Sequence, residues 1–138
     1  MFELKWQDKG AIGVFSTIIG DLAIGVAGLT ENAAKKAGFD IVKGMASAPD
    51  RHPGVMPGAS ELNVKLIFLR DTGVLVGGQV WGSVSAGELL NAISTSISGR
   101  MKADEIAMFQ MGTHPALTAS PIVYQIVDAA ENALRKMR

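Results

Sequence analysis

The chain has 138 residues, of which 48% are hydrophobic and 19% charged, and it contains no cysteine. This balance is typical of one globular domain, and the lack of cysteine excludes a disulfide, a thiolate metal site or a redox-active dithiol within the chain. Thirteen basic residues balance thirteen acidic ones, so no overall field attracts nucleic acid or an anionic membrane surface. We expect neither as a partner, whereas a neutral and rather apolar surface favours self-association.

The beginning of the chain mixes charged and apolar residues and lacks the basic stretch and apolar run of a secretory signal. A cytoplasmic location is therefore expected. We interpret residues 1–10 as an N-terminal extension and residues 11–138 as a single domain. Residues 11–30 form the longest weakly polar stretch, but glycine, serine, threonine and Asp21 interrupt it, which makes it too polar to cross a bilayer.

The first half of the domain begins with a predicted hairpin. Residues 11–19 and 22–28 are rich in Val, Ile and Phe, and Gly20-Asp21 between them is typical of a tight turn. Thr30 can then accept a hydrogen bond from the first turn of a short helix. The sequence predicts this helix over residues 31–37.

A second hairpin is predicted in the middle of the chain. Residues 39–48 favour an extended conformation, and the three prolines and two glycines of residues 49–58 indicate a surface loop. Residues 63–70 and 74–81 then have the composition of two strands on either side of a turn at residues 71–73. Glycines at the centre of the last strand indicate a bulge or a close backbone contact.

Two longer helices are predicted near the C-terminus. Ser85 and Glu88 have the spacing of a capping box ahead of one apolar stripe. Ser120 can cap the other helix, and Pro121 suits its first position, so we expect this helix to run to Arg138. Because strand pairs alternate with helices without βαβ order, the fold class is α+β, with an antiparallel sheet and helices packed on one side.

Few side chains are candidates for chemistry. The two histidines both precede proline, in His52-Pro53 and His114-Pro115, and no acidic cluster beside them indicates a metal site. His114 is the candidate for catalysis, since histidine titrates near neutrality, although it can equally be a loop residue that anchors a turn. No serine lies in a G-x-S-x-G elbow, and no glycine pattern fits a nucleotide-binding loop.

Four segments, in order, resemble the C-terminal dimerisation domain of the pyridine nucleotide-disulfide oxidoreductases, in particular the NADH oxidase and coenzyme A-disulfide reductase branch. Gly28 to Gly38 resembles the family pattern G-L-T-E-x-x-A-x-x-x-G, and Lys65 to Phe68 resembles its K-[LI]-[IV]-[FY] strand. Gly77 to Gly82 resembles G-x-Q-x-x-G, and His114-Pro115 resembles the H-P turn. The resemblance covers residues 11–135.

This resemblance implies a homodimer of a flavin-dependent enzyme that uses FAD and NAD(P)H. The FAD-binding fingerprint, the redox cysteine and the NAD domain of the family are absent from the chain, so these would lie on the same gene or on another chain. In the disulfide-reductase branch, the H-P histidine acts as an acid and base in the partner subunit's site, a role that would fall on His114. A glutamate five residues further orients that histidine, whereas this chain has Ala119 there, so a structural or substrate-facing role for His114 stays open.

Two functions follow as hypotheses. The first is a homodimerisation domain that has no cofactor or catalysis of its own. Its twofold interface is expected to include residues of the second hairpin and of the methionine-rich segment 101–111. The predicted interface residues are Phe68, Val80, Trp81, Met108, Phe109 and Met111. The alternative is a stand-alone protein that binds a small carboxylate or thioester ligand in a cleft near His114.

Overall fold

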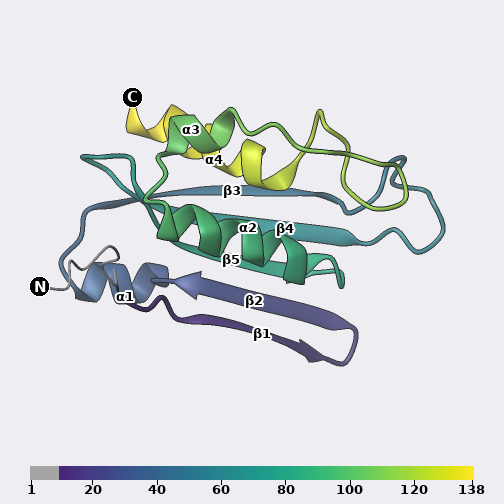
Figure 1. Ribbon diagram of the computed structural model, residues 1–138, viewed down its shortest axis with the longest axis horizontal. Helices are drawn as coiled ribbons and strands as arrows, with labels where there is room; N and C mark the ends of the chain where they lie inside the picture. Colours follow the sequence, from purple (N-terminus) through teal and green to yellow (C-terminus); the bar gives the residue numbers. More distant parts are fainter. Residues whose placement is uncertain (1–9) are drawn as a thin grey trace, which may run out of the picture.

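The computed structural model describes residues 10–138, so the predicted extension, apart from Gly10, lies outside the described residues. Five strands form one antiparallel sheet in the order β1-β2-β5-β4-β3. The strands are β1 (Val14–Ile19), β2 (Leu22–Gly28), β3 (Ile41–Pro49), β4 (Glu61–Leu69) and β5 (Leu75–Gly82). The helices are α1 (Glu31–Lys36), α2 (Ala86–Ser98), α3 (Ala103–Ala107) and α4 (Gln125–Met137). Figure 1 shows α2, α3 and α4 on one face of the sheet, which confirms the predicted α+β architecture.

Both predicted hairpins are present. The turn Gly20-Asp21 joins β1 to β2, and Gly20 has a φ of +61°, a conformation that glycine adopts without strain. The second hairpin pairs β4 with β5, and its register shifts between Ile67 and Phe68. A methyl group on Gly77 would collide with the backbone of Leu29, and one on Gly78 would lie 2.6 Å from Ile93. The predicted close contact at these two glycines is therefore confirmed.

The core lies between the sheet and the three helices that cover it. Helix α2 crosses β2 and β5, while α4 lies against β3 and β4. Alternate residues of β4 point into this core, and Val64, Leu66 and Phe68 are completely buried there. Small residues on both sides allow a close approach, since Gly44 of β3 faces the backbone of α4 at Ala129. Among the described residues, no helix is long and apolar enough to cross a membrane.

The short helix α1 lies at one end of the opposite face of the sheet. Thr30 caps it as predicted, because its hydroxyl accepts a hydrogen bond from the amide of Ala33 at 3.2 Å. Its Glu31 carboxylate forms ion pairs with the ammonium groups of Lys35, Lys43 of β3 and Lys65 of β4. These hydrogen bonds hold the pKa of Glu31 well below its usual range. The ion pairs therefore connect α1 to two strands of the sheet.

The predicted capping box at the start of α2 is wrong. Ser85 is the residue before the helix, but its side chain makes no capping hydrogen bond. Its hydroxyl instead donates to the carboxylate of Asp50 at 3.3 Å, and its amide donates to the hydroxyl of Ser83. The Ser85 side chain, which the local pattern predicted to cap the helix, therefore forms a hydrogen bond with a residue 35 positions away in the sequence.

The predicted start of the last helix is also wrong. Helix α4 begins at Gln125, not at Pro121, and residues 121–123 form a turn after Ser120. The Ser120 carbonyl accepts from the amide of Val123 at 3.1 Å, which closes this turn. The side chain of Gln125 is buried and donates to the carbonyls of Ala48 and Pro49 in β3. This long-range anchor accompanies the later start of the helix.

Candidate functional site: two His-Pro loops

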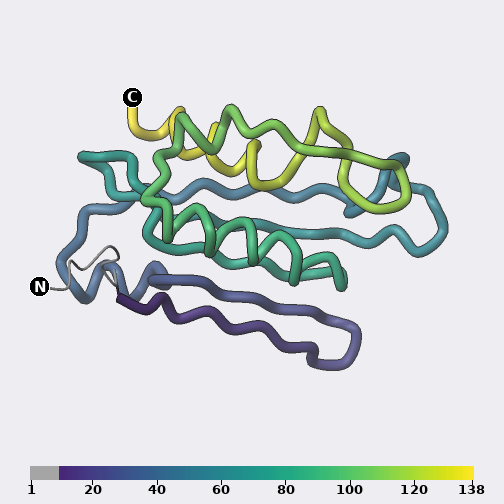
Figure 2. Tube along the Cα trace, viewed as in Figure 1, coloured from purple at the N-terminus to yellow at the C-terminus, as the bar shows by residue number. Residues whose placement is uncertain are grey.

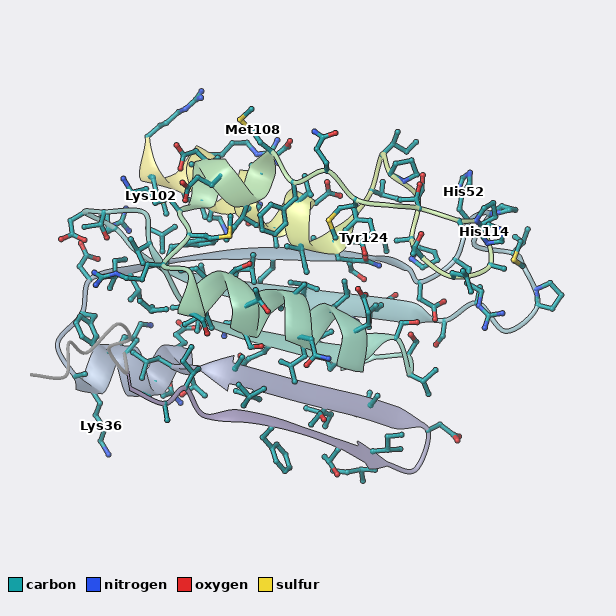
Figure 3. All side chains as sticks on the ribbon, viewed as in Figure 1. Lys36, His52, Lys102, Met108, His114 and Tyr124 are labelled. Carbon is teal, nitrogen blue, oxygen red and sulfur yellow. The ribbon has the colours of Figure 1, made fainter. Side chains whose placement is uncertain are left out.

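The two His-Pro dipeptides lie on loops that meet at one end of the molecule. The β3–β4 loop carries His52, and the segment between α3 and α4 carries His114 (Figure 2). The amide of His52 donates to the carbonyl of Pro115 at 3.0 Å, so the two backbones are in direct contact. Both histidines appear together at this end in Figure 3, far from Lys36 of α1. The sequence identified the two residues separately and did not predict that they meet.

A compact turn fixes His114. Its carbonyl accepts hydrogen bonds from the amides of Leu117 and Thr118, and its amide donates to the Thr118 hydroxyl at 3.1 Å. The ring nitrogen Nδ1 accepts from the amide of Ala116 at 3.2 Å. With Nδ1 occupied as an acceptor, the neutral ring carries its proton on Nε2, which is then the donor available to a ligand.

The β3–β4 loop is anchored at its base by a buried carboxylate. Asp50 accepts from the amide of Ser60 at 2.8 Å through Oδ1 and from the Ser85 hydroxyl through Oδ2. Tyr124 lies in the same polar cluster beneath the His114 turn. Burial, and then the charge of Glu88, raises the pKa of the Tyr124 phenol. These contacts connect both histidine loops to the starts of α2 and α4.

A pocket of about 150 Å³ lies between the two loops. Its lining consists of His52, Thr113, His114, Pro115, Ala119, Ser120 and Pro121. It therefore combines two imidazoles and two hydroxyls with small apolar side chains, and none of the lining residues is acidic. Within residues 10–138, no group of three His, Asp or Glu side chains is arranged to hold a metal ion. The pocket is suited to a small polar ligand rather than to a metal.

Ala119 bears directly on the role of His114. The resemblance places at this position a glutamate that orients the histidine, and the structure has a nearly buried methyl group there, in the wall of the pocket. The backbone amide of Ala116 instead bonds to the imidazole. The turn therefore orients His114 without a carboxylate.

A second hollow, of about 470 Å³, lies at the opposite end of the sheet, near the start of β5. Its lining is mostly apolar and includes Leu29, Val76 and Ile97, with Arg100 as the one charged side chain.

Two of the predicted interface residues have buried side chains. Phe68 and Val80 both have 0% of their surface exposed and lie in the core beneath the helices. Their side chains therefore have no surface to offer to a second subunit, and this part of the prediction is wrong. The alternation of the strands explains the error, because every second residue of β4 and β5 faces the helices.

The other four interface candidates differ in accessibility. Met108 follows α3 and is 77% exposed, and Figure 3 shows its side chain pointing away from the body of the molecule. Phe109 and Met111 are half-buried and pack against the core. Trp81 is half-buried on the open face of the sheet, on the side away from α2 and α4. No observation tests whether these four residues contact a second chain, and they stay predictions.

The sequence prediction missed two apolar side chains that lie near His114. Leu117 in the His114 turn is 73% exposed, and Ile122 in the turn before α4 is 82% exposed. Because α4 begins at Gln125, Ile122 lies before the helix and is exposed to solvent. These two residues and Met108 are all exposed and all belong to the segment from α3 to the start of α4, and we call them the α3–α4 surface.

The similarity of the chain to known proteins defines its class. The model of the family "pyridine nucleotide-disulphide oxidoreductase, dimerisation domain" matches residues 14–122, and the chain belongs to this family. It is 36% identical to an NADH oxidase of Methanocaldococcus jannaschii over 86% of this chain and 26% of that protein. It is 32% identical to a dihydrolipoyl dehydrogenase of Bacillus subtilis over 77% of this chain and 22% of that protein.

Solved structures agree with this assignment. An NAD-dependent persulfide reductase from A. fulgidus superimposes with a TM-score of 0.83 and 28% identity, over 92% of this chain and 23% of that one. A water-forming NADH oxidase from Lactobacillus brevis gives a TM-score of 0.81 and 26% identity, over 90% of this chain and 27% of that one. The chain spans about a quarter of the length of the curated relatives that it matches.

Proposed function

We propose that the chain is the homodimerisation domain of a flavin-dependent NAD(P)H oxidoreductase. Its FAD and NAD(P)H sites and its redox cysteine would lie on domains carried by the same gene or by another chain. The 138 residues contain neither a cysteine nor a glycine-rich nucleotide loop, so the redox chemistry would belong to those domains. In this proposal residues 11–138 act as one domain whose own task is to join two subunits.

The observation that carries the proposal is the α3–α4 surface. Met108, Leu117 and Ile122 each leave most of their side chain in water, although the neighbouring residues Ile106, Ala119 and Tyr124 are buried. Apolar side chains grouped on one surface are typical of an interface. A twofold contact uses the same surface on both copies, so one such surface per chain is enough to form a dimer.

Charge reversal on this surface tests the proposal. We expect Met108→Glu and Ile122→Glu to convert a dimer into a monomer in multi-angle light scattering, because each carboxylate would have to be desolvated at the interface. Ile18→Glu on β1 is the matched control, since Ile18 is also exposed, at 60%, but lies on the far edge of the sheet. Phe109 is a poorer choice because it packs against the core, and its substitution would disturb folding as well as association. Dimers in both α3–α4 variants would contradict the proposed interface.

We also propose that His114 faces the active site of the partner subunit in the assembled enzyme. Its Nε2 atom is the free donor, and the turn holds the ring without a carboxylate. In the complete enzyme we expect His114→Gln to lower kcat while the light-scattering mass stays that of a dimer. An unchanged kcat would leave His114 with a structural role only.

The alternative, a stand-alone protein that binds a small ligand, is favoured by one observation. The pocket beside His114 is lined by a second imidazole and by Thr113 and Ser120, which can form hydrogen bonds with a small ligand. A saturable rise in melting temperature with carboxylate or thioester compounds, in a chain that stays monomeric, would favour this function over dimerisation.

A further inference from the structure

We propose that His52 and His114 together form a binding site for a small carboxylate group. In this site each of the two imidazoles donates a hydrogen bond to the ligand. The starting observation is that the chain has two histidines, 62 positions apart, and that both line one pocket. This proposal does not depend on dimerisation, because both loops belong to one chain.

A hydrogen bond between backbone atoms holds the two histidine loops together. The amide of His52 donates to the carbonyl of Pro115, the residue that follows His114. Two residues earlier, the buried Asp50 fixes the same loop through Ser60 and Ser85. At the other side of the pocket, the turn of His114 is closed by hydrogen bonds that involve its own amide, carbonyl and ring. The two imidazoles are therefore held on fixed backbones rather than on free loops.

Both rings have hydrogen-bonding capacity left for a ligand. His114 uses Nδ1 as an acceptor, which leaves Nε2–H as a donor in the neutral ring. His52 is exposed, and within residues 10–138 its imidazole makes no hydrogen bond with another side chain or with the backbone. A carboxylate has two acceptor oxygens and no donor, so it can accept one hydrogen bond from each ring.

The electrostatics of the pocket favour an anion over a cation. No lining residue is acidic, and Asp50, the nearest carboxylate in the sequence, is committed to Ser60 and Ser85. Arg51 lies next to His52 and directs its guanidinium to the carbonyl of Pro57 at 2.9 Å. A transition metal would need further ligands beyond two imidazoles.

The size of the pocket restricts the ligand class. Its volume of about 150 Å³ is below the range of about 300–1,000 Å³ that is typical of pockets for drug-sized ligands, and it suits a carboxylate with a short substituent. Pro115, Ala119 and Pro121 provide apolar surface for the substituent. The ligand class is therefore a short-chain carboxylate, or the carboxylate end of a longer substrate that extends into solvent.

The test uses nuclear magnetic resonance of the full chain without a tag. With two histidines in the sequence, their ring Cε1–H signals can be assigned from His52→Gln and His114→Gln. We expect acetate to shift both signals in a saturable manner. Acetamide, which has a similar shape but no charge, and sodium chloride at equal ionic strength should not do so.

Variants decide whether both rings take part. Each single histidine substitution should weaken acetate binding at least about fivefold, because each removes one charge-assisted hydrogen bond. His52→Gln keeps the backbone bond to Pro115, so the loop stays in place. Lys36→Gln removes a positive charge at the far end of the molecule and should change nothing (Figure 3). An equal shift with chloride, or unaltered affinity in His52→Gln, would overturn the proposal. Light scattering of the same samples reports the oligomeric state separately.

Discussion

Replacing Gly44 of β3 by alanine should weaken the packing of α4 on the sheet, because the added methyl group has no room. A Cβ atom at Gly44 would collide with the carbonyl oxygen of Ala129 and would lie 2.8 Å from its carbonyl carbon. It would also lie 2.9 Å from the amide nitrogen of Ala133, whereas ordinary contacts begin near 3.4 Å. All three atoms belong to the backbone of the helix, so no side chain can rotate away, and the helix itself must move.

The expected cost is about 3 kcal/mol of unfolding free energy, at the upper end of the range for an overpacked core. Helix α4 contributes Ile126, Ala129 and Ala130 to that core, and its first residue, Gln125, bonds to the end of β3. A displaced helix would therefore also disturb the histidine loops. The assay is urea unfolding followed by circular dichroism, with the midpoint and slope compared with those of the unaltered chain.

Gly87→Ala is the matched control for this prediction. Gly87 lies in the first turn of α2, and a methyl group there would meet nothing within 4 Å. Alanine should stabilise this helix by up to about 1 kcal/mol. If Gly44→Ala were as stable as the unaltered chain, the close backbone contact between β3 and α4 would be refuted.

Two further predictions concern buried and paired carboxylates. The folded-state pKa of Glu31 lies below its unfolded value, so its ion pairs stabilise the fold above about pH 4.5 and are lost as the pH falls through the folded-state pKa. Glu31→Gln should lower the unfolding free energy by about 1–2 kcal/mol at pH 7, and the difference should shrink in acid; a difference independent of pH would contradict this assignment. Asp50→Asn should cost about 1–3 kcal/mol, because the amide nitrogen that replaces one carboxylate oxygen cannot accept the hydrogen bond from the Ser85 hydroxyl. The substitution should also move the ring signals of His52, and unchanged stability and spectra would show that Asp50 does not anchor the loop.

Local patterns were enough to predict most of the elements. Alternation and turn residues located β1, β2, β4 and β5, and the Thr30 cap located α1. These signals depend on residues that are neighbours in the sequence, and the predicted elements are present in the structure. The antiparallel sheet with helices on one side followed from the order of the elements.

Two of the errors arose where a side chain forms a hydrogen bond with a residue far away in the sequence. Ser85 has the spacing of a cap but bonds to Asp50, and the last helix begins at Gln125, which anchors to β3. Phe68 and Val80 were assigned to an interface because the sequence does not say which face of a strand the helices cover. The contact between the backbones of His52 and Pro115 has no sequence signal at all, since 63 positions separate the two residues.

The most direct test of the central claim is the solution mass of the purified 138-residue chain by light scattering, recorded with its visible absorbance. We expect a colourless particle of twice the chain mass of 14.5 kDa. A particle of 14.5 kDa at the highest concentration that stays in solution would contradict the claim that this domain joins two subunits by itself.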